Sequence, residues 1–397
     1  MKALRFEGRG GEYFRIWIVN VLLTIVTLSV YYPWAKVRTR RYFLASTALE
    51  GRAFDYHATG RQLLPGYLIS VVLVLLFVGA QTVYPLAGPV LAVVLLLAGP
   101  WIVWRSVSFN LRMTSFSNVR FGFDGTAGGA YASYLVWPLL LVAALLSGPA
   151  TGLALGALGV GENAPGVAIA AAVLSLAGYV AAFFAYAAVK SRQTHYLVDG
   201  YRYGQGRFAT SVRVGGFAKI LIRTIGLSLG VAFVVLTVAA LVAFATGAAT
   251  DLLSLAEGLD DPEALESTLA GGATLALIAL VYAGLLFAGM LLLAYAYTRQ
   301  RAYILGHSAL DGTVRFASTL GARRYAWVLT SNLVLIALTL GLAVPWARVR
   351  MARTVVERTE VDVGAGLDGY VDAKRAEQSS LGEQIGDAFD VDVGIGF

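Results

Sequence analysis

Long apolar segments alternate with shorter polar ones along the whole chain. The apolar segments fall at about residues 16–33, 64–84, 86–104, 131–157, 165–188, 219–248, 271–297 and 325–346. Most exceed the roughly 18 residues that separate a bilayer-spanning helix from a buried core helix. The pattern therefore predicts a helical membrane protein.

The first and last apolar segments carry the same motif. Residues 20–38 and 332–350 align at a constant offset of 312 positions, and both end in Pro-Trp-Ala followed by a basic pair. The shared positions are Asn20 and Asn332, Pro33 and Pro345, Trp34 and Trp346, and the basic pairs Lys36/Arg38 and Arg348/Arg350. We expect a related pair of elements that brackets the rest of the chain.

Composition and charge place the polar segments relative to the membrane. Hydrophobic residues make up 58% of the chain and charged residues 14%, against about 25% charged in a soluble domain. The 31 Lys and Arg fall in six blocks separated by the apolar segments, whereas residues 251–266 hold six acids and no base. The positive-inside rule assigns the basic blocks to the cytoplasm and the acidic connection to the outside. This asymmetry accounts for the net charge of +7 without nucleic acid.

Two topologies fit the charge pattern. Six segments are predicted full spans: 64–84, 86–104, 131–157, 165–188, 219–248 and 271–297. If 16–35 and 325–347 also cross, ten basic residues at the two ends would lie outside, against the rule. We favour re-entrant or interfacial helices for these two segments, with both termini cytoplasmic, and keep eight full spans as the alternative.

A second repeat follows the cytoplasmic blocks. Four times an apolar segment ends in Arg, followed four positions later by an aromatic: Arg38/Tyr42, Arg105/Phe109, Arg192/Tyr196 and Arg299/Tyr303. Turn pairs such as Glu50-Gly51 and Asp311-Gly312 follow, which predicts a β-hairpin in each of the blocks 36–62, 105–130, 190–216 and 298–324. The expected fold class is an all-α membrane protein, a polytopic helical bundle with internal repeats, plus a small cytoplasmic β-hairpin layer.

The last residues change character. Residues 357–397 contain ten acids and three bases, and Val391, Val393, Ile395 and Phe397 alternate with other residues as in a strand. A short helix is predicted at 377–389. We expect residues 1–356 to form the transmembrane domain and the acidic tail, 357–397, to dock on the basic hairpins.

Candidate catalytic groups are few. The three histidines lie in the predicted hairpins, and the chain has no cysteine and no metalloprotease, phosphate-loop or nucleophile-elbow motif. The predicted spans hold no ionisable residue at depth, which argues against a proton-coupled carrier. We assign no catalytic, metal or cofactor-binding residue, and expect no enzyme and no cofactor.

Candidate binding residues gather where the apolar segments end. The basic ones are Arg38, Arg105, Arg192, Arg299, Lys36, Arg348 and Arg350. In one interpretation Trp34 and Trp346 anchor at headgroup level, Pro33 and Pro345 break the helices that precede them, and the basic pairs contact anionic lipid. In the other, the four repeated arginines ring a pore mouth and bind a phosphate or a lipid headgroup. Asn20, Asn332, Pro33 and Pro345, with Trp34 and Trp346, are expected to form a central polar hinge.

The motifs resemble the YjgN-like family of bacterial inner-membrane proteins. The matching stretches are EYFRIWIVN at 12–20, TLSVYYPWAKVR at 27–38, PWARVR at 345–350 and GEQIGDAFDVDVG at 382–394. Ser29 departs from the glycine usual in the family, and Gly341 retains it. The resemblance implies an inner-membrane location and several spans, and supplies no substrate, cofactor or catalytic residue.

The sequence is compatible with two functions. The first is a transporter or channel for a small or amphipathic solute. The second is a structural or lipid-organising membrane protein that binds anionic headgroups and a cytoplasmic partner. Membrane lipids are the expected partners, nucleic acid is not, and a homo-oligomer is left open. A continuous polar cavity at the bilayer midplane would favour transport, and lipid-filled grooves would favour the second function.

Overall fold

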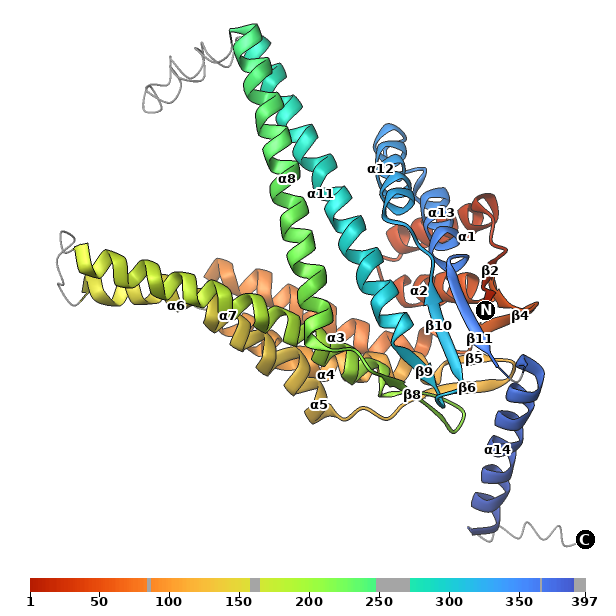
Figure 1. Ribbon diagram of the computed structural model, residues 1–397. Coiled ribbons are helices and arrows are strands. Elements are labelled where there is room, and N and C mark those ends of the chain that lie inside the picture. The colour runs from red at the N-terminus through yellow and green to blue at the C-terminus, as the bar shows by residue number, and fades with distance from the viewer. Residues whose placement is uncertain (84–86, 158–164, 248–271, 365, 389–397) are drawn as a thin grey trace, which may run out of the picture. The chain divides into compact units, whose positions relative to one another are not determined.

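Figure 1 shows the computed structural model of the protein. It describes residues 1–83, 87–157, 165–247, 272–364 and 366–388. The chain forms two compact units. The first comprises Met1–Ala218, Arg301–Thr319 and Gly341–Phe397, and the second comprises Lys219–Gln300 and Leu320–Leu340.

Pairs of helices alternate with short strands along the described chain. The helices are α1 (Gly10–Val26), α2 (Tyr32–Ala45), α3 (Gly60–Val83), α4 (Ala87–Arg112), α5 (Ala127–Tyr131), the π-helix η1 (Ala132–Val136), α6 (Trp137–Ala157), α7 (Pro165–Val198), α8 (Val214–Thr246), α11 (Gly272–Gly306), α12 (Ala322–Leu338), α13 (Val344–Val356) and α14 (Leu367–Ala388). The strands are β1 (Lys2–Ala3), β2 (Arg5–Phe6), β3 (Thr47–Leu49), β4 (Arg52–Tyr56), β5 (Thr114–Phe116), β6 (Val119–Phe123), β7 (Tyr201–Tyr203), β8 (Gly206–Thr210), β9 (Ser308–Leu310), β10 (Val314–Ser318) and β11 (Thr359–Val363).

Six of the described helices are long and apolar enough to cross a membrane. These stretches are Gly60–Ala80, Gly88–Arg112, Ala127–Thr151, Ile169–Val198, Val214–Thr246 and Leu275–Gly306. They coincide with the six segments that the hydrophobic pattern predicts as full spans. Helices α1 and α12 have only 17 residues each, fewer than the roughly 20 that a bilayer requires.

All the described strands form one antiparallel sheet of eleven strands, in the order β1-β11-β10-β9-β8-β7-β6-β5-β4-β3-β2. The two end strands, β1 and β2, are separated in the chain only by Leu4, whose amide donates to the Thr359 carbonyl at 3.0 Å. The chain itself therefore bridges the two ends of the sheet, which is a nearly closed barrel.

This barrel corrects the predicted fold class. The expected all-α bundle with a small hairpin layer is wrong, because the four hairpins pair with one another through β4–β5, β6–β7 and β8–β9. The N-terminal strands and β11, which the hairpin repeat did not include, then join the two ends. Closure leaves few unpaired strand edges, which would otherwise be open to aggregation.

The hairpins are shorter than the predicted blocks because α2, α4, α7 and α11 continue past the repeated arginines and aromatics. Their turns form at the predicted residue pairs. Glu50 and Gly51 have φ of 51° and 78°, and Asp311 and Gly312 have φ of 52° and 70°. Two successive residues with positive φ give the two-residue turn that matches the twist of a hairpin.

Apolar side chains fill the barrel. One cluster combines side chains from every hairpin and from β11: Leu49, Phe116, Val119, Tyr203, Leu310, Val314 and Val361. Leu367 and Val371 of α14 belong to the same cluster, and Val371 is fully buried. The barrel is therefore a packed core rather than a channel.

Helix α14 also contacts the hairpin turns through polar groups. Lys374 pairs with Asp311 at 2.8 Å, the Arg375 guanidinium donates to the Ser117 carbonyl at 3.0 Å, and Asp368 pairs with Arg52. Basic as well as acidic side chains of α14 thus make these contacts. The strand predicted near the C-terminus and the acidic connection at 251–266 lie outside the described residues.

Helices α1 and α12 end in turns of the same local geometry, here named the first and second elbow (residues 27–31 and 339–343). The hydroxyls of Thr27 and Thr339 donate to carbonyls four residues back, at 2.7 Å each. The next two residues adopt positive φ: Leu28 (47°) and Ser29 (71°) in the first elbow, Leu340 (49°) and Gly341 (91°) in the second.

The prolines lie in the helices that follow the elbows. Pro33 and Pro345 occupy the first turns of α2 and α13 and are almost completely buried. The expected helix break at the proline is therefore wrong. The left-handed residues end α1 and α12, and proline fits the first turn of a helix, where its missing N–H has no intrahelical partner to lose.

Candidate functional site

Helix α13 packs directly on α1, so the two ends of the chain meet. Tyr13 is fully buried in a cluster with Phe6 and Val349. The Arg353 guanidinium donates to the Gly8 carbonyl at 2.7 Å across 345 positions of sequence. The first unit therefore contains a three-helix assembly of α1, α2 and α13.

The tryptophans of the repeated motif pack on glycines at helix starts. The Trp346 ring covers Gly10, the first residue of α1, and stacks on Phe14 at 5.0 Å. The Trp34 ring covers Gly60, the first residue of α3. A side chain at either glycine would overlap the ring, so both tryptophans have a packing role inside the protein.

A cavity of about 440 Å³ lies among α1, α2 and α13. We name it the elbow cavity. It is lined by Trp17, Asn20, Val21, Thr24, Ile25, Tyr32, Ala35, Lys36, Thr39, Arg40 and Arg348. The predicted residues Asn20, Lys36 and Arg348 come together here. Arg40 was not predicted, although its spacing of four from Lys36 places both on one face of α2.

The cavity is apolar at one end and basic at the other. Ile25 and Tyr32 flank the first elbow, whereas Lys36 and Arg40 lie one and two helical turns further along α2. Such a gradient matches an amphiphile, with an apolar part toward the elbow and an anionic part toward the bases.

The three basic side chains of the cavity have no acidic counterpart. In the described part of the chain no carboxylate lies within 4 Å of Lys36, Arg40 or Arg348. Neutral groups hold two of them: Arg40 bonds Asn110 and Tyr56, and Arg348 donates to the Tyr13 hydroxyl at 3.2 Å.

Of these three cations, Lys36 has a pKa shifted by its surroundings. Burial and, second, the charge of Arg40 lower the pKa of its ammonium group. Both effects disfavour the charged form, and a nearby anion would favour it by its opposite charge. Three cations gathered around one cavity are chemically compatible with an anionic ligand.

Asn20 adds a neutral polar group beside these charges. Its side chain is 5% exposed, and its Nδ2 donates to the Ala35 carbonyl at 3.4 Å. Its Oδ1 is buried and has no hydrogen-bond partner among the described residues. Asn332, in the second unit, is also buried.

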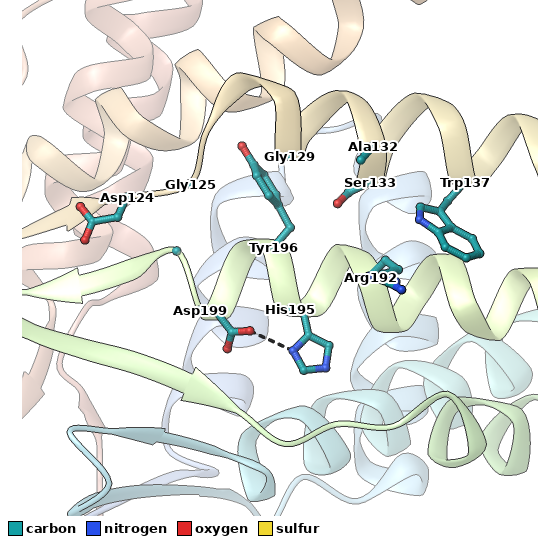
Figure 2. A pocket seen from close by; sticks show the side chains of 11 residues that line it. Asp124, Gly125, Gly129, Ala132, Ser133, Trp137, Arg192, His195, Tyr196 and Asp199 are labelled. Carbon is teal, nitrogen blue, oxygen red and sulfur yellow. Dashed lines mark hydrogen bonds and ion pairs between the residues drawn. The ribbon is translucent and has the colours of Figure 1, made fainter.

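A second cavity of about 440 Å³ lies where α7 ends beside η1 (Figure 2). The ring of His195 bonds the Asp199 carboxylate at 2.9 Å through Nδ1 and the Val212 carbonyl at 3.0 Å through Nε2. Both ring nitrogens are thus occupied, and Asp199 also accepts from the Thr210 amide at 2.7 Å. The pair ties α7 to the strand and loop after it, and leaves no ring nitrogen to act on a substrate.

The repeated arginines pair mainly with aromatic groups. Arg192 lies 5.1 Å above the Trp137 ring, where Figure 2 shows it at the edge of the second cavity, and Arg299 lies 5.5 Å from Tyr295. Arg38 donates to the Tyr31 hydroxyl at 3.2 Å. Arg105 and Arg350 are exposed. None of these five lines the elbow cavity.

Six of the described helices are long and apolar enough to cross a membrane, and the chain that joins them forms one sheet, which defines a polytopic membrane protein. Comparison with known proteins specifies the family. The chain belongs to the family described as "Bacterial protein of unknown function (DUF898)", which it matches over residues 1–388.

The curated relatives place the chain in the bacterial inner membrane. It is 27% identical to inner membrane protein YjgN of Salmonella typhimurium over 387 residues, which cover 96% of this chain and 93% of the relative. It is 35% identical to inner membrane protein YjgN of Escherichia coli K12 over 139 residues, 34% of each chain. No solved structure matches the chain significantly. The resemblance read from the motifs is thereby confirmed.

Proposed function

We propose that this inner-membrane protein binds an anionic phospholipid in the elbow cavity. The observation that carries the proposal is the cavity itself, which brings Lys36, Arg40 and Arg348 together without a carboxylate and is apolar at its other end. Phosphate oxygens accept hydrogen bonds from Lys and Arg, and basic groups near a membrane surface attract anionic headgroups.

The elbows supply the means of reaching the lipid. Leu28 is 89% exposed and Leu340 95% exposed, and Val26 and Leu338 beside them are exposed as well. Apolar tips of this kind are unfavourable in water and favourable in the acyl region of a bilayer. In the proposal both elbows dip into the membrane interface, and the headgroup lies at the level of Lys36.

The proposed orientation follows the basic residues. The barrel and both termini face the cytoplasm, because the basic blocks belong there by the positive-inside rule. Since the chain has no cysteine, single cysteines at Glu12 and Glu257 would report sidedness, and labelling of Glu12→Cys from the periplasm would reverse this assignment.

The spans favour lipid over a dissolved solute. In no candidate span is more than 11% of the most apolar window buried inside the protein. A cavity of about 390 Å³ between α8 and α11 is lined by Ala239, Ala240, Ala243, Leu277, Ile278, Val281, Tyr282 and Leu285. Nearly all of these side chains are apolar, which suits acyl chains better than a polar substrate.

Lys36 and Arg38 allow a matched test, because both belong to the motif and only Lys36 lines the cavity. We expect Lys36→Gln to weaken binding of anionic phospholipid to the purified protein about fivefold, as one interfacial cation contributes about 1 kcal/mol. Lipid binding would be measured by native mass spectrometry of the detergent-solubilised protein.

Arg38→Gln is the control, since it removes the same charge from the same helix. It is expected to leave the affinity within twofold of that of the unaltered protein. Equal losses in the two variants would mean that surface charge, rather than the cavity, attracts the lipid, and the proposal would fail.

A further inference from the structure

The ring of His195, near the end of α7, bonds two groups that accept hydrogen bonds. Its Nδ1 lies 2.9 Å from the Asp199 carboxylate, and its Nε2 lies 3.0 Å from the Val212 carbonyl. A neutral imidazole carries one N–H, and its other nitrogen is itself an acceptor. Only the imidazolium form therefore donates to both partners at once, whereas a neutral ring leaves one nitrogen facing an acceptor.

The proton of the contact with Asp199 belongs to the ring. Imidazole is a stronger base than a carboxylate, and the other oxygen of the Asp199 carboxylate accepts from the Thr210 amide at 2.7 Å. The His195 side chain is 38% exposed, so the ring exchanges its proton directly with solvent.

The bond to Val212 attaches the loop that leads into α8. This loop, residues 211–213, follows β8, and Val212 is buried against the start of α8. Two helices hold the loop: the Tyr303 hydroxyl of α11 accepts from the Arg213 amide at 2.8 Å, and the His195 ring of α7 donates to the middle residue. A loss of the His195 bond therefore loosens the attachment of the loop to α7.

Other titratable groups surround the ring. They are Arg192 and Tyr196 on α7, Asp199 after it, Asp124 after β6, Tyr134 on η1, Arg202 on β7, Arg213 in the loop, Tyr303 on α11 and His307 after it. Histidine is the only one of these residue types that ordinarily changes charge between about pH 5 and 8. His307 is therefore the group that an experiment has to separate from His195.

We propose that His195 is a proton-dependent clamp on the loop before α8. In the imidazolium form the ring donates to both Asp199 and Val212. When the proton leaves to solvent, the remaining N–H stays with the carboxylate, which is the stronger acceptor, and the bond to Val212 is lost. The attachment of the loop thus follows pH between about 5 and 8. The clamp lies outside the elbow cavity and does not depend on lipid binding there.

A spin label on Gly215→Cys reports the start of α8. The chain has no other cysteine, and nothing lies within 4 Å of a Cβ placed on Gly215, so the label disturbs no contact. We expect the mobile component of the full-length protein to be about fivefold larger at about pH 8.5 than at about pH 5.5, because one hydrogen bond is lost.

His195→Gln removes the titrating ring, and its label mobility is expected to be the same at both pH values. His307→Gln is the matched control. The His307 ring bonds the Tyr303 carbonyl at 2.8 Å through Nδ1, which a neutral ring does as well as a charged one. This variant should keep the pH transition.

Nitrogen NMR of the histidine rings in the label-free protein gives a second measurement, which does not need the His195 variant to fold. The His195 signals should change from two protonated nitrogens to a protonated Nδ1 alone, over the same pH range as the label. His57→Gln and His307→Gln assign the signals.

Three results overturn the clamp. The first is label mobility that does not change with pH while the His195 ring loses its proton. The second is a pH transition that persists in His195→Gln, and the third is a transition that disappears in His307→Gln.

Discussion

At Ser29 and Gly341 the two elbows place different residues in the same backbone conformation. Their φ values are 71° and 91°. A residue with a Cβ atom is strained in this region by about 1–2 kcal/mol, and glycine is not. Ser29 is exposed, and nothing lies within 4 Å of a Cβ placed on Gly341. The conformational strain at these two positions therefore depends on the backbone alone and not on side-chain contacts.

Exchanging the residue types should move stability in opposite directions. Ser29→Gly is expected to raise the free energy of unfolding by about 1 kcal/mol, and Gly341→Ala to lower it by about 1–2 kcal/mol. Thermal unfolding of the purified protein measures both. Destabilisation by Ser29→Gly would show that the serine side chain contributes more than the strain it introduces.

At the scale of elements, a hydrogen-bonded contact here named the tyrosine latch accounts for three of the four repeated aromatics, whereas the fourth, Phe109, has no hydroxyl. The Tyr42 hydroxyl accepts from the Arg9 amide at 2.8 Å and donates to its carbonyl at 2.9 Å. Tyr303 makes the same pair with Arg213 at 2.8 and 3.3 Å. Tyr196 donates to the Thr126 carbonyl at 3.0 Å. Each latch holds the residue just before a helix start against the end of another helix.

Removal of a latch hydroxyl should loosen this junction. We expect Tyr303→Phe to lower the stability of the purified protein by about 1–2 kcal/mol, because a backbone amide and carbonyl lose their partner. Tyr297→Phe is the control on the same helix, since its ring stacks on Tyr325 at 4.8 Å and its hydroxyl has no hydrogen bond within the described residues. Equal losses of stability in the two variants would mean that any change of this kind in α11 destabilises the protein, and that the Tyr303 hydrogen bonds are not the cause.

At the scale of the whole molecule, α14 fastens to the barrel through Asp311. Burial alone would raise the pKa of this carboxyl, but hydrogen bonds from Lys374, the Arg207 amide and Tyr370 lower it below its ordinary value of 3.8. For Lys374, burial alone would lower the pKa, and the bonds to Asp311 and Glu377 raise it above 10.5. The two shifts give the contact a pH window.

The directions of the two pKa shifts determine how docking of α14 depends on pH. A depressed carboxyl pKa stabilises the docked helix above pH 3.8, and this contribution is lost as pH falls below it. A raised lysine pKa stabilises docking below pH 10.5, and this contribution is lost as pH rises further. Docking of α14 is therefore expected to be constant between these limits and weaker outside them.

A spin label on Ala373→Cys would report this docking, as the chain has no other cysteine. The label should be immobile inside the pH window and mobile outside it. Asp311→Asn should weaken docking by about 1–2 kcal/mol and abolish the acid-side transition. Persistence of that transition in Asp311→Asn would locate its cause in another group.

Local patterns predicted much of the fold, because helix and turn formation depend on nearby residues. The six long apolar helices and the turns at Glu50-Gly51 and Asp311-Gly312 follow from length and residue type. The helix ends at the elbows were missed, because proline suggested a break that left-handed residues at Leu28 and Ser29 impose earlier. For the site, Asn20, Lys36 and Arg348 were predicted singly, and Arg40 was not predicted at all.

The sequence by itself determined the class of protein, the six long apolar helices, and the two matched Pro-Trp-Ala motifs with their basic pairs. These properties depend on hydrophobicity and on local backbone preference. Only the tertiary structure decided that the hairpins close into a barrel through β1, β2 and β11, and that Arg348 joins Lys36 around one cavity. Both depend on contacts between residues more than 300 positions apart, which no local period encodes.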